Sequence, residues 1–93
     1  MRKCLKIRIL GKIQTAAYRA HIQKSAAALG VEGTVQNNAD GSIIVYACGL
    51  SDILDQFIDA LYVGTKDATV QDVLAEPFVN EKDLRGVFRI IGD

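Results

Sequence analysis

The sequence is poor in the residues that most often build metal and redox centres. It has one histidine, His21, and two cysteines, Cys4 and Cys48, which lie far apart and lack the short spacing of metal ligands. A zinc site would therefore need carboxylates to complete its ligand set. We expect no bound metal and no cofactor, and we expect His21 to be a surface residue.

The chain also lacks an excess of charge of either sign and any long hydrophobic run. Eleven Lys and Arg residues balance eleven Asp and Glu residues, whereas general nucleic-acid binders depend on a positive field. No run reaches the roughly 18 apolar residues of a membrane span, and the N-terminal "MRKCLKIRILGK" lacks the apolar core of a signal peptide. We expect a soluble, cytoplasmic protein, taken as a monomer, without nucleic-acid or membrane partners.

What the sequence does contain is enough for one domain over residues 1–93, because typical domains run to roughly 100–150 residues. Apolar side chains alternate with Lys6 and Arg8 in residues 3–10, which is typical of a half-buried strand. Further strands are predicted at residues 31–37, 42–49, 68–76 and 87–92, with a polar segment at 80–86 before the last.

Two segments carry apolar residues at the spacing of an amphipathic helix. The first runs from about residue 18 to residue 29 and ends at Gly30. The second follows Ser51, whose side chain can cap a helix, and ends at Gly64. Their buried faces are expected to be Ile22, Ala26 and Leu29 in the first helix, and Leu54, Phe57, Ile58 and Leu61 in the second.

The order β-α-β-β-α-β, with a short extra C-terminal strand, predicts an α+β fold. It describes a ferredoxin-like sandwich, in which an antiparallel sheet carries two helices on one face. In this topology the first and third strands are antiparallel neighbours, so Cys4 and Cys48 are expected to meet at disulfide distance. Because cytosolic conditions keep most such pairs reduced, we predict only that the two cysteines lie close together and make no prediction about the bond.

The other face of the sheet leaves two interpretations open. Ile44, Tyr46 and Cys48 are expected to point away from the helices, as a contact surface or, more simply, as a partly covered sheet face. Binding of single-stranded RNA there would use Tyr46 with Lys6 and Arg8. That function needs several exposed aromatic side chains backed by positive charge, so the pattern disfavours it.

The loop before the first helix has the features of an anion site. Thr15, Ala16 and Ala17 are small, and Arg19 follows them at the start of the helix. The free N–H groups of a helix N-terminus favour anions, and a guanidinium group matches two phosphate oxygens. Asn37, at the end of the second strand, is a further candidate, although an asparagine there usually serves the turn itself.

Taken together, these residues resemble the acylphosphatase family, whose pattern reads approximately G-x-V-Q-G-V-x-[FY]-R, a helix ending in L-G, then G-x-V-x-N-x-x-D-G. This chain has "GKIQTAAYR" followed by "ALGVEGTVQNNADGSIIVYACG", and "FIDALYVGTKDATVQDV" and "FRI" are similar to later segments of the family. The matching positions are Gly11, Gln14, Tyr18, Arg19, Leu29, Gly30, Gly33, Val35, Asn37, Asp40, Gly41 and Gly49.

The resemblance implies hydrolysis of the carboxyl–phosphate bond of small acyl phosphates without metal or cofactor. It makes Arg19 the phosphate anchor and Asn37 the residue that orients the attacking water. It also makes the backbone of a phosphate-binding loop the cradle for the phosphoryl group and for product-like phosphate or sulfate, with the residues Gln14, Thr15, Ala16, Ala17 and Tyr18.

The loop departs from this family where Thr15, Ala16 and Ala17 replace its glycine-containing segment. If Thr15 needs a positive φ, the loop must carry strain on the order of 1–3 kcal/mol or adopt another shape. If only a small side chain is required, Thr15 fits and its hydroxyl adds a donor to the phosphate. The alternative function is therefore a catalytically weakened module of the same fold, which binds phosphate, other anions or a protein partner.

Overall fold

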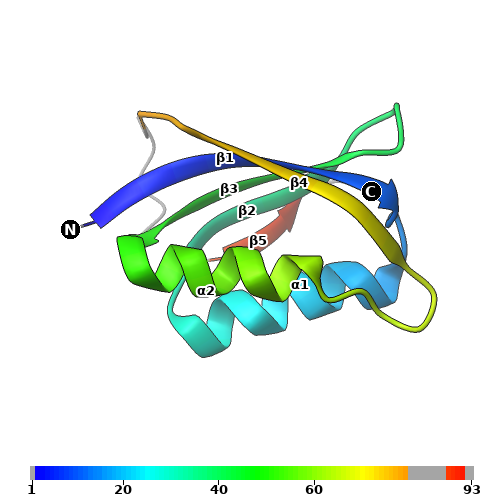
Figure 1. The fold of residues 1–93 in the computed structure, drawn as a ribbon, viewed down its shortest axis with the longest axis horizontal. Helices are drawn as coiled ribbons and strands as arrows, with labels where there is room; N and C mark the ends of the chain where they lie inside the picture. Colours follow the sequence, from blue (N-terminus) through cyan, green and yellow to red (C-terminus); the bar gives the residue numbers. More distant parts are fainter. Residues whose placement is uncertain (1, 80–87, 92–93) are drawn as a thin grey trace.

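The computed structural model describes residues 2–79 and 88–91 (Figure 1). Its elements follow the predicted order: β1 (Arg2–Lys12), α1 (Ala16–Leu29), β2 (Glu32–Asn37), β3 (Ile43–Leu50), α2 (Ser51–Tyr62), β4 (Thr69–Pro77) and β5 (Phe88–Ile91). The polar segment predicted at residues 80–86 lies outside the described residues. The element order expected from the sequence is confirmed.

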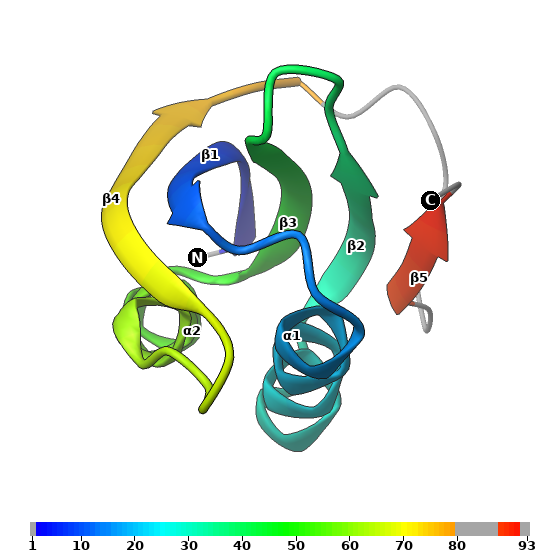
Figure 2. The ribbon, with the colours of Figure 1, turned by 90° about the vertical axis from the view of Figure 1, so that its right-hand side faces the viewer.

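The strands form one sheet in the order β4-β1-β3-β2-β5. The pairs β1–β3, β1–β4 and β2–β3 are antiparallel, as a ferredoxin-like sandwich requires, and β5 adds to the outer edge of β2 in parallel. Both helices cover the same face of the sheet, while the other face is left open (Figure 1, Figure 2). The predicted fold is thus confirmed, with a sheet that becomes mixed at its β5 edge.

The core lies between the sheet and the two helices. Strand alternation turns every second side chain of β1 and β3 toward the helices, and the helical stripes meet them. The buried side chains at this interface include Leu5, Ile7, Ile9, Ile22, Ala26, Ile43, Val45, Ala47, Leu54, Phe57 and Leu61, with Leu29 and Ile58 partly buried beside them. This packing fixes where α1 begins relative to the ends of the strands.

The helix boundaries differ from the prediction in three places. α1 begins at Ala16, earlier than expected, because the Thr15 hydroxyl accepts a hydrogen bond from the Tyr18 N–H and caps the helix. Ser51 is already helical: β3 runs directly into α2, so extended Leu50 takes the cap position without a side-chain bond. Likewise Val63, before Gly64, is the C-terminal cap of α2. Gly30 ends α1 in a left-handed conformation, as predicted.

A bulge at the end of β1 directs the chain toward the start of α1. The pairing of β1 with β4 shifts register between Leu10 and Gly11. Gly11 has φ +139°, and a Cβ atom there would lie 2.2 Å from the carbonyl oxygen of Thr69. A side chain is therefore excluded at this position, and the bulge bends the strand as such irregularities do.

Cys4 and Cys48 lie opposite each other in the register of β1 and β3. Their Cα atoms are 4.1 Å apart and a disulfide joins them, closing a loop with a sequence separation of 44 residues. In the chain-entropy model a bridge of this span stabilises by about 4 kcal/mol. The bridge lies near the start of β1. At 3.3 Å per residue it is roughly 26 Å along the strand from Lys12, the last residue of β1. The cytoplasmic location, which would favour the reduced pair, stays a prediction.

The turn between β2 and β3 is held by Asp40. Its Oδ1 accepts hydrogen bonds from the hydroxyl (2.6 Å) and the backbone N–H (3.0 Å) of Ser42. Its Oδ2 forms an ion pair with Arg8 on the open face of the sheet. The bonds from Ser42, and to a smaller extent the Arg8 guanidinium, hold the pKa of the Asp40 carboxyl below its ordinary value. The turn is therefore coupled to the ionisation of one side chain.

Reduction of the Cys4–Cys48 bridge is expected to lower the free energy of unfolding by about 2–4 kcal/mol. Thermal unfolding followed by circular dichroism, with and without dithiothreitol, measures the effect. The double variant Cys4→Ser/Cys48→Ser should melt where the reduced protein melts and should ignore the reductant. Thiol titration confirms that reduction is complete. If the fully reduced protein then melts at the same temperature as the oxidised protein, the expectation is contradicted.

Acid is expected to weaken the Asp40 turn. The folded-state pKa is lowered, so this carboxylate contributes stability above the unfolded value of about 3.9 and loses it as the pH falls through the folded-state value. Urea unfolding at several pH values should show Asp40→Asn less stable than the parent at pH 6, with a difference that shrinks toward pH 2. Asp59→Asn, at an exposed carboxylate on α2, is the control. A difference that stays constant over this range would uncouple Asp40 ionisation from folding.

Candidate active site

The connection between β1 and α1 is held over the β2–β3 turn by Gln14. Its side-chain Nε2 donates hydrogen bonds to the carbonyl oxygens of Asn38 (2.6 Å) and Ser42 (2.9 Å). Figure 2 looks onto this end of the molecule, where the chain leaves β1, crosses in front of β3 and enters α1. Gln14 thereby places the first turn of α1 beside the end of β2.

The first turn of α1 presents free backbone donors at this place. The N–H of Thr15 bonds to the Ile13 carbonyl (2.8 Å), and the N–H of Arg19 bonds to the Thr15 carbonyl (3.2 Å). Ala16 and Ala17 are the first two helical residues, so their N–H groups have no carbonyl within the helix to bond. The first turn carries no acidic residue. These two amides can therefore donate to an anion, in the favourable field of the helix dipole.

Arg19 and Asn37 each carry a buried polar atom without a hydrogen-bond partner. Among residues 2–79 and 88–91, the Arg19 Nε and the Asn37 Oδ1 are the only buried side-chain nitrogen and oxygen atoms in this state. Asn37 pairs with Ile43, which pairs in turn with Ile9 near the end of β1. An unpaired buried polar group costs about 1–3 kcal/mol. One unsatisfied donor and one unsatisfied acceptor thus lie at the end of the sheet where α1 begins.

Thr15 does not have the strained positive φ that it would need if it had to copy a glycine conformation. Its φ and ψ are −117° and 153°, which is ordinary extended backbone. No non-glycine residue in the described part of the chain has a positive φ. Thr15 therefore carries no backbone strain, and its hydroxyl accepts a hydrogen bond from the Tyr18 N–H (3.0 Å). The Tyr18 N–H, predicted as part of the cradle, is consequently already bonded.

The side chain of Tyr18 anchors α1 to α2. It is completely buried, and its hydroxyl donates to the carbonyl oxygen of Leu61 at 2.6 Å. This burial raises the pKa of the phenol far above its ordinary value. Tyr18 therefore positions the first turn of the helix through its ring, while its backbone closes the cap.

The expectation that His21 is a surface residue is wrong. Its ring is half-buried, its Nε2 lies 2.9 Å from the carbonyl oxygen of Ala60, and it stacks on Tyr18 with ring centroids 6.0 Å apart. The reason is that this position of α1 faces α2. His21 thus supports the packing of the two helices.

The open face of the sheet has the alternation that the sequence predicts, and a hollow of about 250 Å³ lies in it. Its charges are compensated in place, because Arg8 pairs with Asp40 and Glu76 lies opposite Lys6 in the β1–β4 register. Tyr46 is half-buried and packs edge-on against Phe78. This arrangement disfavours the stacking of RNA bases.

Within residues 2–79 and 88–91, no three His, Cys, Asp or Glu side chains gather in a way that could hold a metal ion. Neither described helix is long and apolar enough to cross a membrane.

Asp67 is a neighbour of the site that the sequence does not indicate. It lies after α2, 52 residues from Thr15, and its Oδ1 is 3.3 Å from the Thr15 hydroxyl. No spacing or motif in the sequence links two residues so far apart. The contact exists only because the turn before β4 folds back to the start of α1.

Comparison with known proteins shows which family this chain is similar to. The acylphosphatase family model matches residues 5–90. An acylphosphatase of Vibrio parahaemolyticus is 35% identical over 89 residues, which cover 96% of this chain and 97% of that protein. An acylphosphatase of Azoarcus sp. is 39% identical over 67 residues, covering 72% and 68% of the two chains.

A solved structure shows the same fold. The crystal structure of acylphosphatase from Bacillus subtilis superposes with a TM-score of 0.88 over 99% of this chain and 100% of that chain, at 24% identity. The family model spans nearly the whole chain, and the match to the relative from Vibrio parahaemolyticus covers nearly the whole length of both proteins. The chain therefore belongs to the acylphosphatase family of hydrolases that act on acyl phosphates.

Proposed function

We propose that this chain hydrolyses small acyl phosphates at the end of the sheet where α1 begins. Arg19 and the free N–H groups of Ala16 and Ala17 hold the phosphoryl group, and Asn37 orients the attacking water. The observation that carries the proposal is the pair of buried, unpartnered atoms, the Arg19 Nε and the Asn37 Oδ1, beside a helix N-terminus. A phosphoryl oxygen and a water molecule are the partners that these two atoms lack.

The reaction needs little more than this. The water oxygen forms a bond to phosphorus while the bond from phosphorus to the acyl oxygen breaks, and the carboxylate leaves with the electron pair. A carboxylate is a good leaving group, so no general acid is required, and the proton of the water passes to solvent. Catalysis of phosphoryl transfer depends mainly on positioning and on stabilisation of negative charge. Arg19 and two amides supply the charge stabilisation, and the Asn37 Oδ1 accepts a hydrogen bond from the water.

Every proposed site residue comes from one chain, so we propose that the enzyme works as a monomer. Inorganic phosphate, the product, is expected to compete with the substrate, and sulfate should occupy the same place. The alternative is a module that binds phosphate without turning it over. It would need Arg19 and the amides but would have no use for Asn37, and the two functions can be separated on that difference.

Hydrolysis of benzoyl phosphate without added metal tests the proposal. Arg19→Ala should lower kcat/KM by at least about 10²-fold, because it removes a donor to the transferring group. Asn37→Ala should lower kcat by about 10²-fold with little change in the dissociation constant of inorganic phosphate. Arg19→Lys should recover only part of the activity, since an ammonium group cannot form the bidentate contact.

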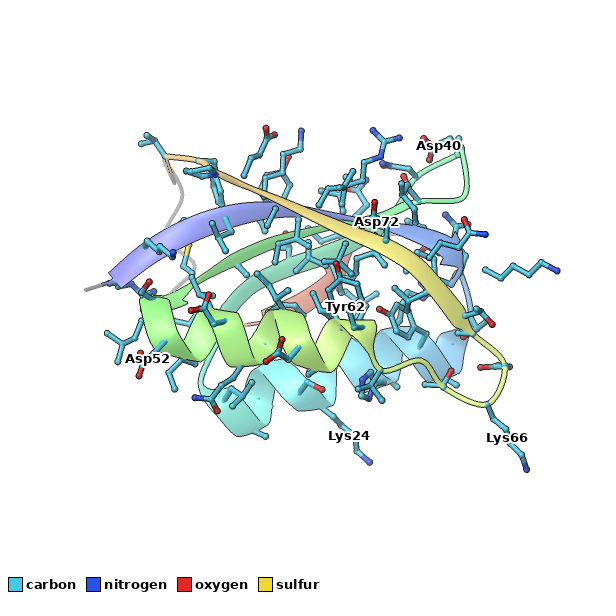
Figure 3. The ribbon with its side chains drawn as sticks, in the orientation of Figure 1. Lys24, Asp40, Asp52, Tyr62, Lys66 and Asp72 are labelled. Carbon is cyan, nitrogen blue, oxygen red and sulfur yellow. A yellow bond between two sulfur atoms is a disulfide. The ribbon has the colours of Figure 1, made fainter. Side chains whose placement is uncertain are left out.

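Lys24→Ala is the matched control, because Lys24 is an exposed cation of the same helix that points away from the sheet (Figure 3). It should leave both kcat and KM unchanged. The binding module would be established instead if the protein hydrolysed no acyl phosphate and bound phosphate in a way that depends on Arg19 and not on Asn37. Parent-like hydrolysis by Arg19→Ala would contradict the proposed site.

A further inference from the structure

Asp67 lies at the centre of a small hydrogen-bonded cluster beside the proposed cradle. Its Oδ1 accepts from the Thr65 hydroxyl at 2.8 Å and from the Thr15 hydroxyl at 3.3 Å. These residues belong to different parts of the chain, the turn between α2 and β4 and the cap of α1. Figure 3 shows Lys66, at the tip of that turn, at the same end of the molecule as the start of α1.

The turn presents Asp67 in a defined position. Thr65 and Ala68 form a bridge, with the Ala68 N–H donating to the Thr65 carbonyl at 3.2 Å. Ala68 is buried in the core, with 6% of its surface exposed. The backbone around Asp67 is therefore held by the Thr65–Ala68 bridge, and its exposed carboxylate is directed by the Thr65 hydroxyl.

This contact determines which way the Thr15 hydroxyl points. An ionised carboxylate only accepts hydrogen bonds, so Thr15 must direct its single proton to Asp67. The lone pairs of the hydroxyl are then left for the Tyr18 N–H, which they receive at 3.0 Å. Asp67 thus orients the side chain that caps α1, and the cap sets the direction of the free amides of Ala16 and Ala17.

A carboxylate is a poor ligand for a phosphoryl group because like charges repel. Asp67 is therefore unsuited to contact the phosphoryl group itself, and the contact that links it to the candidate site is the one with Thr15. We propose that Asp67 is a positioning residue of the phosphate cradle, which holds Thr15 as the cap of α1 so that the Ala16 and Ala17 amides face the phosphoryl group. This inference rests on the proposed function. It adds an explanation of how the loop accommodates Thr15 at a position where the family has glycine.

The test compares Asp67→Ala, Thr15→Val and the double variant in benzoyl phosphate hydrolysis. Asp67→Ala removes the hydrogen bond to Thr15 and should lower kcat/KM by about five- to tenfold, the range of one ordinary hydrogen bond. Thr15→Val removes that bond and also the acceptor for the Tyr18 N–H, so its loss should be at least as large. The double variant should lose no more than Thr15→Val alone, because Asp67 acts through the Thr15 hydroxyl and coupled residues are not additive. Thr15→Gly, which also lacks the hydroxyl, should lose activity to a similar degree.

Rescue separates positioning from a general loss of stability. Asp67→Asn keeps an acceptor oxygen for Thr15, and Thr15→Ser keeps the hydroxyl, so both should retain kcat/KM within about twofold of the parent. Lys66→Ala is the control for a change in the same turn. Amide hydrogen exchange at Tyr18 should be faster in Asp67→Ala and Thr15→Val than in the parent, and unchanged in Asp67→Asn.

Three results would overturn the proposal: parent-like kcat/KM in Asp67→Ala, additive losses in the double variant, or equal damage from Asp67→Asn and Asp67→Ala. Failure of the proposed function has a different signature, since the parent protein would then hydrolyse no acyl phosphate. In that case the dissociation constant of inorganic phosphate and the Tyr18 exchange rate still test the positioning role. Unchanged values in Asp67→Ala would refute it.

Discussion

The two hydrogen bonds donated by the Gln14 side-chain amide are the constraint on which the candidate site depends. They fasten the connection between β1 and α1 to the carbonyl groups of Asn38 and Ser42. Arg19 is carried by the helix on one side of this fastening, and Asn37 by the strand on the other. Because Asn38 and Ser42 flank the Asp40 turn, the stability of that turn and the geometry of the site are linked.

The helix that carries Arg19 is held by more than its apolar stripe. The hydroxyl of Tyr18 bonds to the Leu61 carbonyl, and the ring of His21 contacts the Ala60 carbonyl, so two side chains tie α1 to the end of α2. This anchoring keeps the first turn in place although its two leading amides and the Arg19 Nε are unsatisfied. Burial in the core offsets the cost of leaving these polar groups without partners.

The loop of this chain reaches its shape by capping rather than by glycine flexibility. Thr15 has an extended backbone and bonds through its hydroxyl to both Tyr18 and Asp67. Small side chains at Ala16 and Ala17 then leave their amides accessible, because nothing bulky stands at the start of the helix. The departure from the family pattern thus has a local structural solution, supported by a turn that is distant in the sequence.

The sequence by itself determined the strands, the helices and their order, because alternation in residues 3–10 and helical spacing from Ile22 to Leu29 are local signals of burial. It also singled out Arg19 and Asn37 through their family pattern, and the structure leaves buried atoms of both unpartnered. Only the tertiary structure decided the burial of His21, the cap at Leu50 and the contact of Asp67 with Thr15. These depend on which elements pack side by side, and residues 52 positions apart carry no periodic signal that could reveal it.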